Sequence, residues 1–355
     1  MMRYQNRYRM PAEWEPQSMV QLTWPHQGTD WAPMLGEITD TYLQMAREIA
    51  KREPLLIVVP SRNDLPREVL EMENTTVFEC PTNDTWARDH GFLTIVRSER
   101  AGVTAKRLSE TSAKRLSTRS NLFACQSKNG AQEERGNEER LRSQELVLLD
   151  FQFNGWGKKF AAEKDNAINR QLWNSGILSS PSHSTYQDHN DFVLEGGSIE
   201  SDGKGTIYTT RCCLMAPNRN YKDGRPMTEQ EIEEELKRRL CADRIVWLDD
   251  EPLPGDDTDG HIDTIARITP DGTLLRLPLP DPIFDEDGSP LPATYANYLI
   301  INGAVLVPTY HQPENDKAAL QRIAAVFPDR EMVPIDSRSI IKQHGSIHCC
   351  TMQYY

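Results

Sequence analysis

The chain ends in Gln343-His-Gly-Ser-Ile-His-Cys-Cys-Thr-Met-Gln353, an apolar stretch with two cysteines close to the C-terminus. Chain ends usually fray, so this composition predicts a buried strand and not a tail. Because side chains alternate along a strand, Ile347 and Cys349 would share one face, and His348 and Cys350 the other. His348 would then be badly placed to serve Cys349 as a base. A nucleophilic Cys349 therefore needs a proton-handling partner from elsewhere in the chain.

The composition limits the class of protein. Hydrophobic residues make up 38% of the 355 and charged residues 26%, and no apolar run reaches the roughly 18 residues of a membrane span. No secretory signal is visible, so we expect a cytoplasmic protein with no membrane partner. We expect a homo-oligomer only because such assemblies are common. The net charge of -13 argues against nucleic acid and is compatible with a cationic substrate.

The seven cysteines do not form a disulfide framework in a chain of this length, and no CxxC or HExxH spacing occurs. We therefore expect neither a metal site nor a cofactor.

The apolar periodicity predicts an α/β protein. Residues 34–52 have helical spacing and precede a buried strand at 55–59. Similar units of strands and one helix recur about five times along the chain. The further predicted strands cover 76–80, 92–96, 146–150, 192–200, 205–210, 244–248, 261–268 and 297–307, and the further helices cover 161–175, 228–240 and 315–326.

Residues 98–144 have a different composition. Ala105-Lys-Arg-Leu-Ser109 is repeated at 113–117, acids follow, and apolar periodicity is nearly absent. Such a segment buries too little surface to offset its ordering entropy. We expect a disordered insertion within one catalytic domain that spans residues 1–355.

Several polar residues could form a catalytic site with the thiol. His261 and Asp263 are two apart on a predicted strand and would point the same way, directly after an acidic loop. Asp89 follows Trp86, a pairing that suits a flat cation. In Glu195-Gly-Gly197, the two glycines have no side chain, so other groups can come close to the backbone directly beside an acid. A Cys/His pair alone would also suit a peptidase, and a non-enzymatic protein that binds partners through the 98–144 insertion is a further alternative. Paired carboxylates favour a guanidinium substrate.

Five segments of the chain resemble the signature blocks of the agmatine deiminase family, which is grouped with the bacterial peptidyl-arginine deiminases. They occur in the family's order, and the similarity covers nearly the whole chain except about 98–144. The five blocks are Trp86-Ala-Arg-Asp89, Glu195-Gly-Gly-Ser-Ile199, Gly255-Asp-Asp-Thr-Asp-Gly-His-Ile-Asp263, Ala293-Thr-Tyr-Ala-Asn297 and Gly345-Ser-Ile-His-Cys349.

The resemblance implies a pentein, a five-bladed α/β propeller with a central active site. It implies that Cys349 is the nucleophile, His261 the general acid and base, and Asp89 and Asp263 the guanidinium ligands. The other positions that match site-lining residues are Trp86, Glu195, Asn297, Asp259 and Gly345. Many relatives have Asn at Asp259 and an aliphatic residue at Cys350. The implied reaction converts agmatine to N-carbamoylputrescine and ammonia, and an arginine or peptidyl-arginine deiminase with the same chemistry is the alternative.

Overall fold

The computed structural model describes residues 7–97, 145–178 and 184–355. The insertion expected at 98–144 lies outside the described residues. The α/β class is confirmed, because helices and mixed sheets alternate along the described chain. None of the described helices is both long and apolar enough to cross a bilayer.

Four sheets share one pattern. In each, a central strand has an antiparallel neighbour on one side and, after a crossover helix, a parallel neighbour on the other. The central strands are β2 (Met19–Thr23), β6 (Leu146–Gln152), β9 (Thr206–Thr210) and β18 (Ala304–Thr309). Their antiparallel neighbours are β20 (Thr351–Tyr354), β5 (Leu93–Arg97), β8 (Ile199–Ser201) and β17 (Leu299–Ile301).

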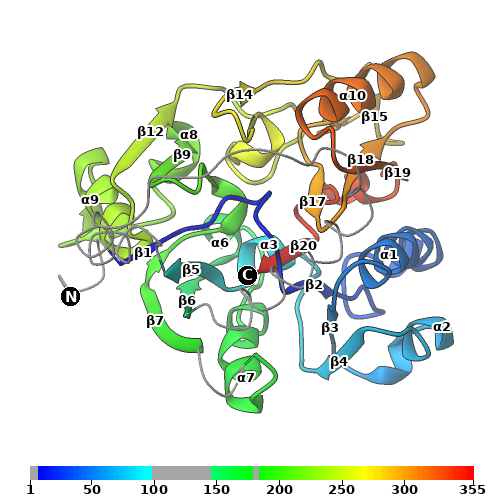
Figure 1. Cartoon of the computed structure of the whole chain (residues 1–355), viewed down its shortest axis with the longest axis horizontal. Coiled ribbons are helices and arrows are strands. Elements are labelled where there is room, and N and C mark those ends of the chain that lie inside the picture. Colours follow the sequence, from blue (N-terminus) through cyan, green and yellow to red (C-terminus); the bar gives the residue numbers. More distant parts are fainter. Residues whose placement is uncertain (1–6, 98–144, 179–183) are drawn as a thin grey trace, which may run out of the picture.

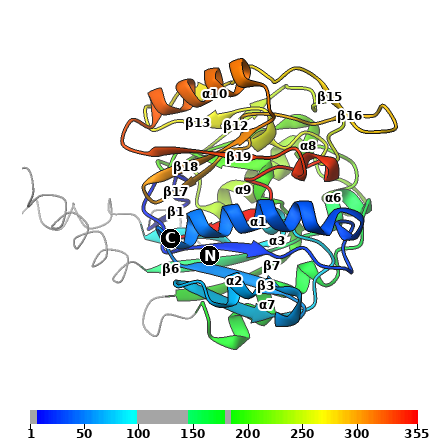
Figure 2. The same cartoon turned by 90° about the vertical axis from the view of Figure 1, so that its right-hand side faces the viewer.

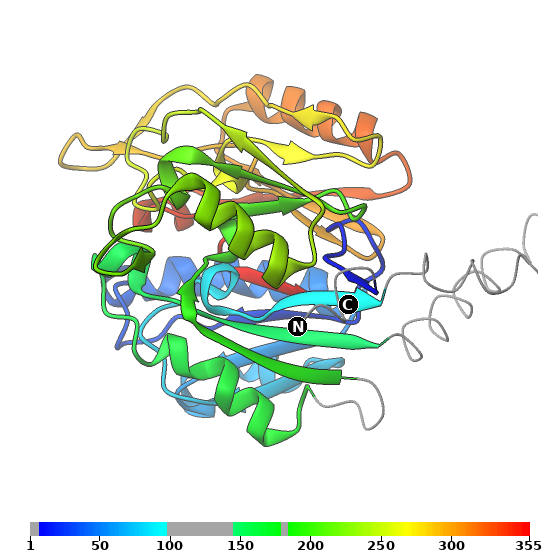
Figure 3. The ribbon, with the colours of Figure 1, turned by 90° about the vertical axis from the view of Figure 1, so that its left-hand side faces the viewer.

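The crossover helices are α1 (Leu35–Ala50), α7 (Ile168–Ser175), α9 (Glu229–Leu240) and α10 (Pro313–Val326). They lead to β3 (Leu55–Val59), β7 (Ser184–Val193), β12 (Arg244–Leu248) and β19 (Glu331–Asp336). These helices lie at the periphery, while β20 runs near the middle of the molecule (Figures 1 and 2). Figure 3 shows α9 and α7 covering the outer side of the sheets opposite α1.

The remaining elements are short. β1 (Tyr8–Arg9) and β4 (Thr75–Glu79) extend two of the sheets. Three two-stranded ladders pair β10 (Tyr221–Lys222) with β11 (Arg225–Pro226), β13 (Arg267–Ile268) with β14 (Leu274–Leu275), and β15 (Ile283–Phe284) with β16 (Pro290–Leu291). The short helices are α2 (Arg67–Leu70), α3 (Ala87–His90), α6 (Gly155–Lys158) and α8 (Arg211–Leu214).

Local sequence explains the crossover helices. The buried face of α1 includes Ile38, Tyr42, Met45 and Ile49, at the helical spacing that the sequence predicted. Helix α9 starts at a capping box between Thr228 and Glu231.

Four predicted strands differ from the structure. A 3-10 turn at Gly196–Ser198 interrupts the strand predicted at 192–200, and the segment 297–307 spans two strands, β17 and β18, instead of one. The other two concern residues of the expected site. Residues 344–350 form turns, and Cys349 precedes β20 instead of lying in a strand. The reason is that the backbone N–H groups of His348 and Cys349 donate to Asn297 Oδ1, at 3.0 and 3.3 Å, instead of to a neighbouring strand. Within 261–268, only β13 is extended, because Ala266 N–H donates to Ile262 O at 2.8 Å in a helical turn.

The helix predicted from residue 161 begins later. A 3-10 turn at Asp165–Ala167 precedes α7 at Ile168. The Asp165 carboxylate accepts hydrogen bonds from Asn83 N–H (2.6 Å) and Asp84 N–H (3.0 Å), which ties the turn to the loop before α3.

Candidate active site

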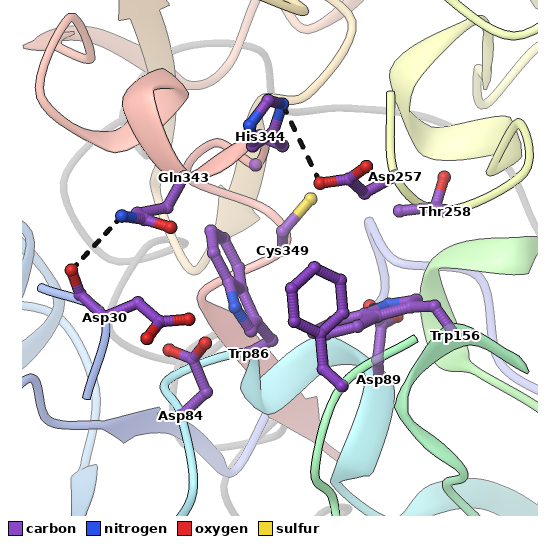
Figure 4. Close-up of a pocket in the computed structure, with 12 residues that line it drawn as sticks. Asp30, Asp84, Trp86, Asp89, Trp156, Asp257, Thr258, Gln343, His344 and Cys349 are labelled. Carbon is purple, nitrogen blue, oxygen red and sulfur yellow. Dashed lines mark hydrogen bonds and ion pairs between the residues drawn. The ribbon is translucent and has the colours of Figure 1, made fainter. Parts of the chain in front are cut away.

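Loops from separate sheets surround a pocket of about 150 Å³. Its wall contains the Cys349 thiol and the indoles of Trp86 and Trp156 (Figure 4). Four aspartates also line the pocket, namely Asp30, Asp84, Asp89 and Asp257. Among the described residues, no lysine or arginine lines it. The pocket is therefore strongly acidic and suits a cation.

Asn297 positions Cys349. Its Nδ2 lies 3.2 Å from Cys349 Sγ, and its Oδ1 accepts hydrogen bonds from the backbone N–H groups of His348 and Cys349. The thiol is 4% exposed. Burial raises the pKa of Cys349 well above its ordinary value, and the carboxylates of Asp263 and Asp89 raise it further. Without a bound cation, Cys349 is therefore a protonated thiol at neutral pH.

Gly197 is the point where His261, Asp89 and Asp263 meet. A Cβ atom at Gly197 would lie 2.6 Å from His261 Nδ1, 3.0 Å from Asp263 Oδ2 and 3.0 Å from Asp89 Oδ1. Asp89 Oδ1 accepts the Gly197 N–H at 3.0 Å. Asp89 Oδ2 accepts the indole N–H of Trp156 at 2.9 Å. The close backbone approach expected at Glu195-Gly-Gly197 thus brings three predicted catalytic side chains together.

His261 is fully buried between two carboxylates. Its Nδ1 lies 3.7 Å from Asp89 Oδ1 and its Nε2 3.6 Å from Glu195 Oε2. Burial lowers the pKa of His261, but Asp89, Cys213 and Glu195 raise it more, so it lies well above the ordinary value. Neither ring nitrogen has a hydrogen-bond partner within the described part of the chain. A protonated imidazole with free N–H groups can donate a proton to a leaving group.

Asp263 has one occupied and one free oxygen. Its Oδ2 lies 2.7 Å from His348 Nδ1 and 3.8 Å from Cys349 Sγ. Its buried Oδ1 has no hydrogen-bond partner in the described chain. Burial raises the pKa of Asp263, but the His348 hydrogen bond and nearby positive charges lower it below the ordinary value. Asp263 is therefore a carboxylate with an unused acceptor.

Two further predicted binding residues share one arginine. Arg219 Nε lies 2.9 Å from one oxygen of the buried Glu195, and Arg219 Nη1 donates to Asp259 Oδ2 at 2.7 Å. Lys159 Nζ donates to the other Asp259 oxygen at 2.7 Å. Asp259 is thus neutralised by two cations and does not itself line the pocket.

Trp86 packs against a glycine. A Cβ atom at Gly345 would lie 2.0 Å from Trp86 Cζ3, so only glycine lets the indole take this position. The ring centroids of Trp86 and Trp156 are 6.3 Å apart in an edge-to-face arrangement.

The family model for Porphyromonas-type peptidyl-arginine deiminases matches residues 9–276 and 273–354. The chain belongs to this family. An agmatine deiminase from Pseudomonas syringae is 27% identical over 98% of the chain and 95% of the relative. A solved agmatine deiminase from C. jejuni, with substrate bound, is 28% identical with a TM-score of 0.79, covering 98% and 96% of the two chains. A structure from Porphyromonas gingivalis, named as a candidate arginine deiminase, is 37% identical with a TM-score of 0.75, covering 98% of both.

In this member of the family, the structure brings together Cys349, His261, Asp89, Asp263 and Asn297, which come from four separate segments of the sequence. Sequence reasoning did not identify several residues of the site. Trp156 lies in a Gly-Trp-Gly turn, which was the signal available in the sequence, and its backbone there is left-handed (φ 52°). Asp30, Asp84, Arg219 and His348 carry no such local signal.

Two groups of side chains contain potential metal ligands. The first is Glu195, Cys213 and His261, and the second is Glu13, Glu200 and His348. Arg219 pairs with Glu195 in the first group, and Arg267 pairs with both glutamates in the second. Carboxylates already neutralised by a guanidinium fit a divalent cation poorly. That the chain uses no metal stays a prediction.

Proposed function

We propose that the protein is an agmatine deiminase, which hydrolyses the guanidinium C–N bond of agmatine to give N-carbamoylputrescine and ammonia without a cofactor. The observation that carries the proposal is the convergence of Cys349, His261, Asp89 and Asp263, of which Cys349 and Asp89 line an acidic pocket and His261 and Asp263 are buried behind it. No described lysine or arginine lines this pocket.

The carboxylates would bind the guanidinium first. Asp89 and Asp263 flank His261, and the free Oδ1 of Asp263 accepts a substrate N–H. The Cys349 thiol loses its proton to solvent as the cation binds, and the thiolate attacks the central carbon. The His261 imidazolium donates a proton to the departing ammonia. This leaves a covalent amidino-thioether. Neutral His261 next takes a proton from water, whose oxygen attacks the same carbon and expels the thiolate, giving the ureido product.

Substrate would also activate the nucleophile. Burial and two carboxylates favour the protonated thiol of Cys349. A guanidinium bound beside Asp89 and Asp263 cancels that negative charge, and a cation next to a thiol lowers its pKa. The reactive thiolate would therefore form mainly in the substrate complex.

The far end of the pocket suits an ammonium group. The carboxylates of Asp30 and Asp84 point toward one another on the side of Trp86 away from Asp257 (Figure 4). Burial raises the pKa of Asp84 to about 6, and the charge of Asp30 contributes to the rise. Above that pH the two acids can bind the primary amine of agmatine.

Within the described ranges, no lysine or arginine lines the pocket to pair with a substrate carboxylate. Arg88 donates to Gln353 and lies 3.2 Å from Glu13, Arg211 pairs with Asp249 and Glu229, and Arg267 pairs with Glu13 and Glu200. The carboxylate of free arginine would be desolvated among like charges, at a cost on the order of several kcal/mol.

The test is the kcat/KM for agmatine, free arginine and a blocked peptidyl-arginine at one pH and one salt concentration, read as ammonia and ureido product. We expect agmatine to be favoured by at least about 100-fold over arginine. The P. gingivalis relative supports arginine or peptidyl-arginine as the second candidate substrate. Equal turnover of arginine would refute the acidic-pocket argument and leave the thiol chemistry standing.

We further propose that the four similar sheets and the β13–β14 ladder are the blades of a five-bladed propeller. The chain would form one catalytic domain from residue 1 to 355, work in the cytoplasm and assemble as a homo-oligomer. Light scattering of the purified protein tests the assembly.

A further inference from the structure

His348, which precedes the proposed nucleophile, connects the pocket to the N-terminal segment. Its Nδ1 lies 2.7 Å from Asp263 Oδ2, and its Nε2 lies 2.7 Å from Glu13 Oε1. The imidazole is fully buried, and the Glu13 side chain is 14% exposed. One ring thus bridges two carboxylates that come from opposite ends of the domain.

Both partners of the ring are ionised. Burial raises the pKa of Glu13, but His348, Arg267 and Arg88 hold it well below its ordinary range. The pKa of Asp263 is also lowered. A carboxylate can only accept, so each ring nitrogen of His348 must donate. These two contacts at 2.7 Å favour the imidazolium form over a neutral ring whose Nε2 would accept from Arg267 Nη2 at 3.3 Å.

The groups around His348 carry both signs of charge. They are the carboxylates of Glu13, Asp263 and Glu200 and the guanidinium groups of Arg88 and Arg267, whose Nη2 lies 3.3 Å from His348 Nε2. The charge of His261 also acts on Asp263, and burial raises the pKa of Glu200. An imidazolium at His348 lies 2.7 Å from both Glu13 and Asp263, so it stabilises these two carboxylates directly.

We propose that Glu13 and His348 form a positioning relay, in which an imidazolium fixed by Glu13 keeps Asp263 ionised and turns its free Oδ1 toward the substrate guanidinium. The inference rests on the proposed guanidinium chemistry. Neither residue contacts the reacting carbon, so both are positioning residues.

The test compares two thiol reagents on Glu13→Gln and His348→Gln. Chloroacetamidine carries a delocalised cation that needs Asp263, whereas iodoacetamide is neutral and reports only the thiol. We expect the chloroacetamidine inactivation rate at pH 7 to fall at least about tenfold relative to iodoacetamide in both variants. Loss of the imidazolium raises the pKa of Asp263. The pH below which the chloroacetamidine inactivation rate falls should therefore be about one unit higher in both variants.

Glu15→Gln is the matched control, because Glu15 is two residues from Glu13 and binds Arg9 at 2.6 Å instead of His348. It should keep the wild-type ratio, and Glu13→Asp, which retains the charge, should restore most of it. A folded Glu13→Gln or His348→Gln variant with the wild-type ratio and pH limb overturns the relay, and so does an equal loss with both reagents. If the wild-type protein deiminates no guanidino compound, the proposed function fails, while the reagent ratio still decides the relay.

Discussion

Gly197→Ala should damage the active site without changing any of its functional groups. The backbone at Gly197 lies outside the left-handed region, so alanine adds only a methyl group there. That methyl would lie 2.6 Å from His261 Nδ1, about 0.8 Å closer than the 3.4 Å of an ordinary contact. It would also lie 3.0 Å from oxygens of Asp89 and Asp263. His261 must therefore move relative to both carboxylates.

A displacement of about 1 Å in a catalytic group costs about 100-fold in rate. We therefore expect kcat/KM for agmatine to fall about 100-fold, which is about 2.7 kcal/mol of transition-state stabilisation. Overpacking a buried site costs about 1–3 kcal/mol of folding free energy, so Tm should fall by only a few degrees. The protein should stay folded at 25 °C while its activity is lost.

Gly36→Ala is the control, because no atom lies within 4 Å of a Cβ placed there, on helix α1. It should keep full activity and gain up to about 1 kcal/mol from helix propensity. Steady-state kinetics and thermal unfolding of both variants provide the measurement. A Gly197→Ala protein with more than half of the wild-type kcat/KM would show that His261 does not need this position, and would refute the reasoning.

Three other predictions concern individual side chains. Cys349→Ser should abolish formation of the ureido product. Cys350→Val should lower the free energy of unfolding by about 1 kcal/mol or less, because Cys350 is fully buried in the apolar cluster around α1. Equal loss of turnover in both variants would contradict the assignment of Cys349 as the nucleophile. The pKa of Cys349 is raised well above its ordinary value, so its alkylation by iodoacetamide without substrate should be slow at pH 7 and accelerate beyond pH 9. Mass spectrometry measures the rate. An alkylation rate that reaches a plateau by pH 8 would count against a protonated thiol at neutral pH. Asp84→Asn should raise the KM for agmatine about tenfold at pH 8. The wild-type KM should rise as pH falls below about 6, because the pKa of the Asp84 carboxyl is about 6 and the group is then protonated. A wild-type KM that is constant from pH 5 to 8 would exclude Asp84 from amine binding.

The sequence by itself determined the order and class of the elements. Helix α1 and strand β3 occur where apolar spacing placed them, because burial of one face is a local periodicity that needs no knowledge of the partner. The chemical character of the site was also readable, since a thiol, a histidine and several acids stand beside glycines and a tryptophan. The five blocks pointed to the family to which the chain belongs.

Only the tertiary structure decided how these groups are oriented. Cys349 and His261 were predicted on strands, yet neither lies in one. The backbone N–H of Cys349 donates to Asn297, which is distant in sequence, whereas that of His261 donates to the nearby Thr258. Arg88 follows the site tryptophan in sequence, but its guanidinium points away to Glu13 and Gln353. The alternation rule does not apply to His348 and Cys349, because neither lies in a strand, and it could not show that His348 binds Asp263. Contacts between residues 13, 263 and 348 depend on how whole sheets pack, and local spacing carries no information about that.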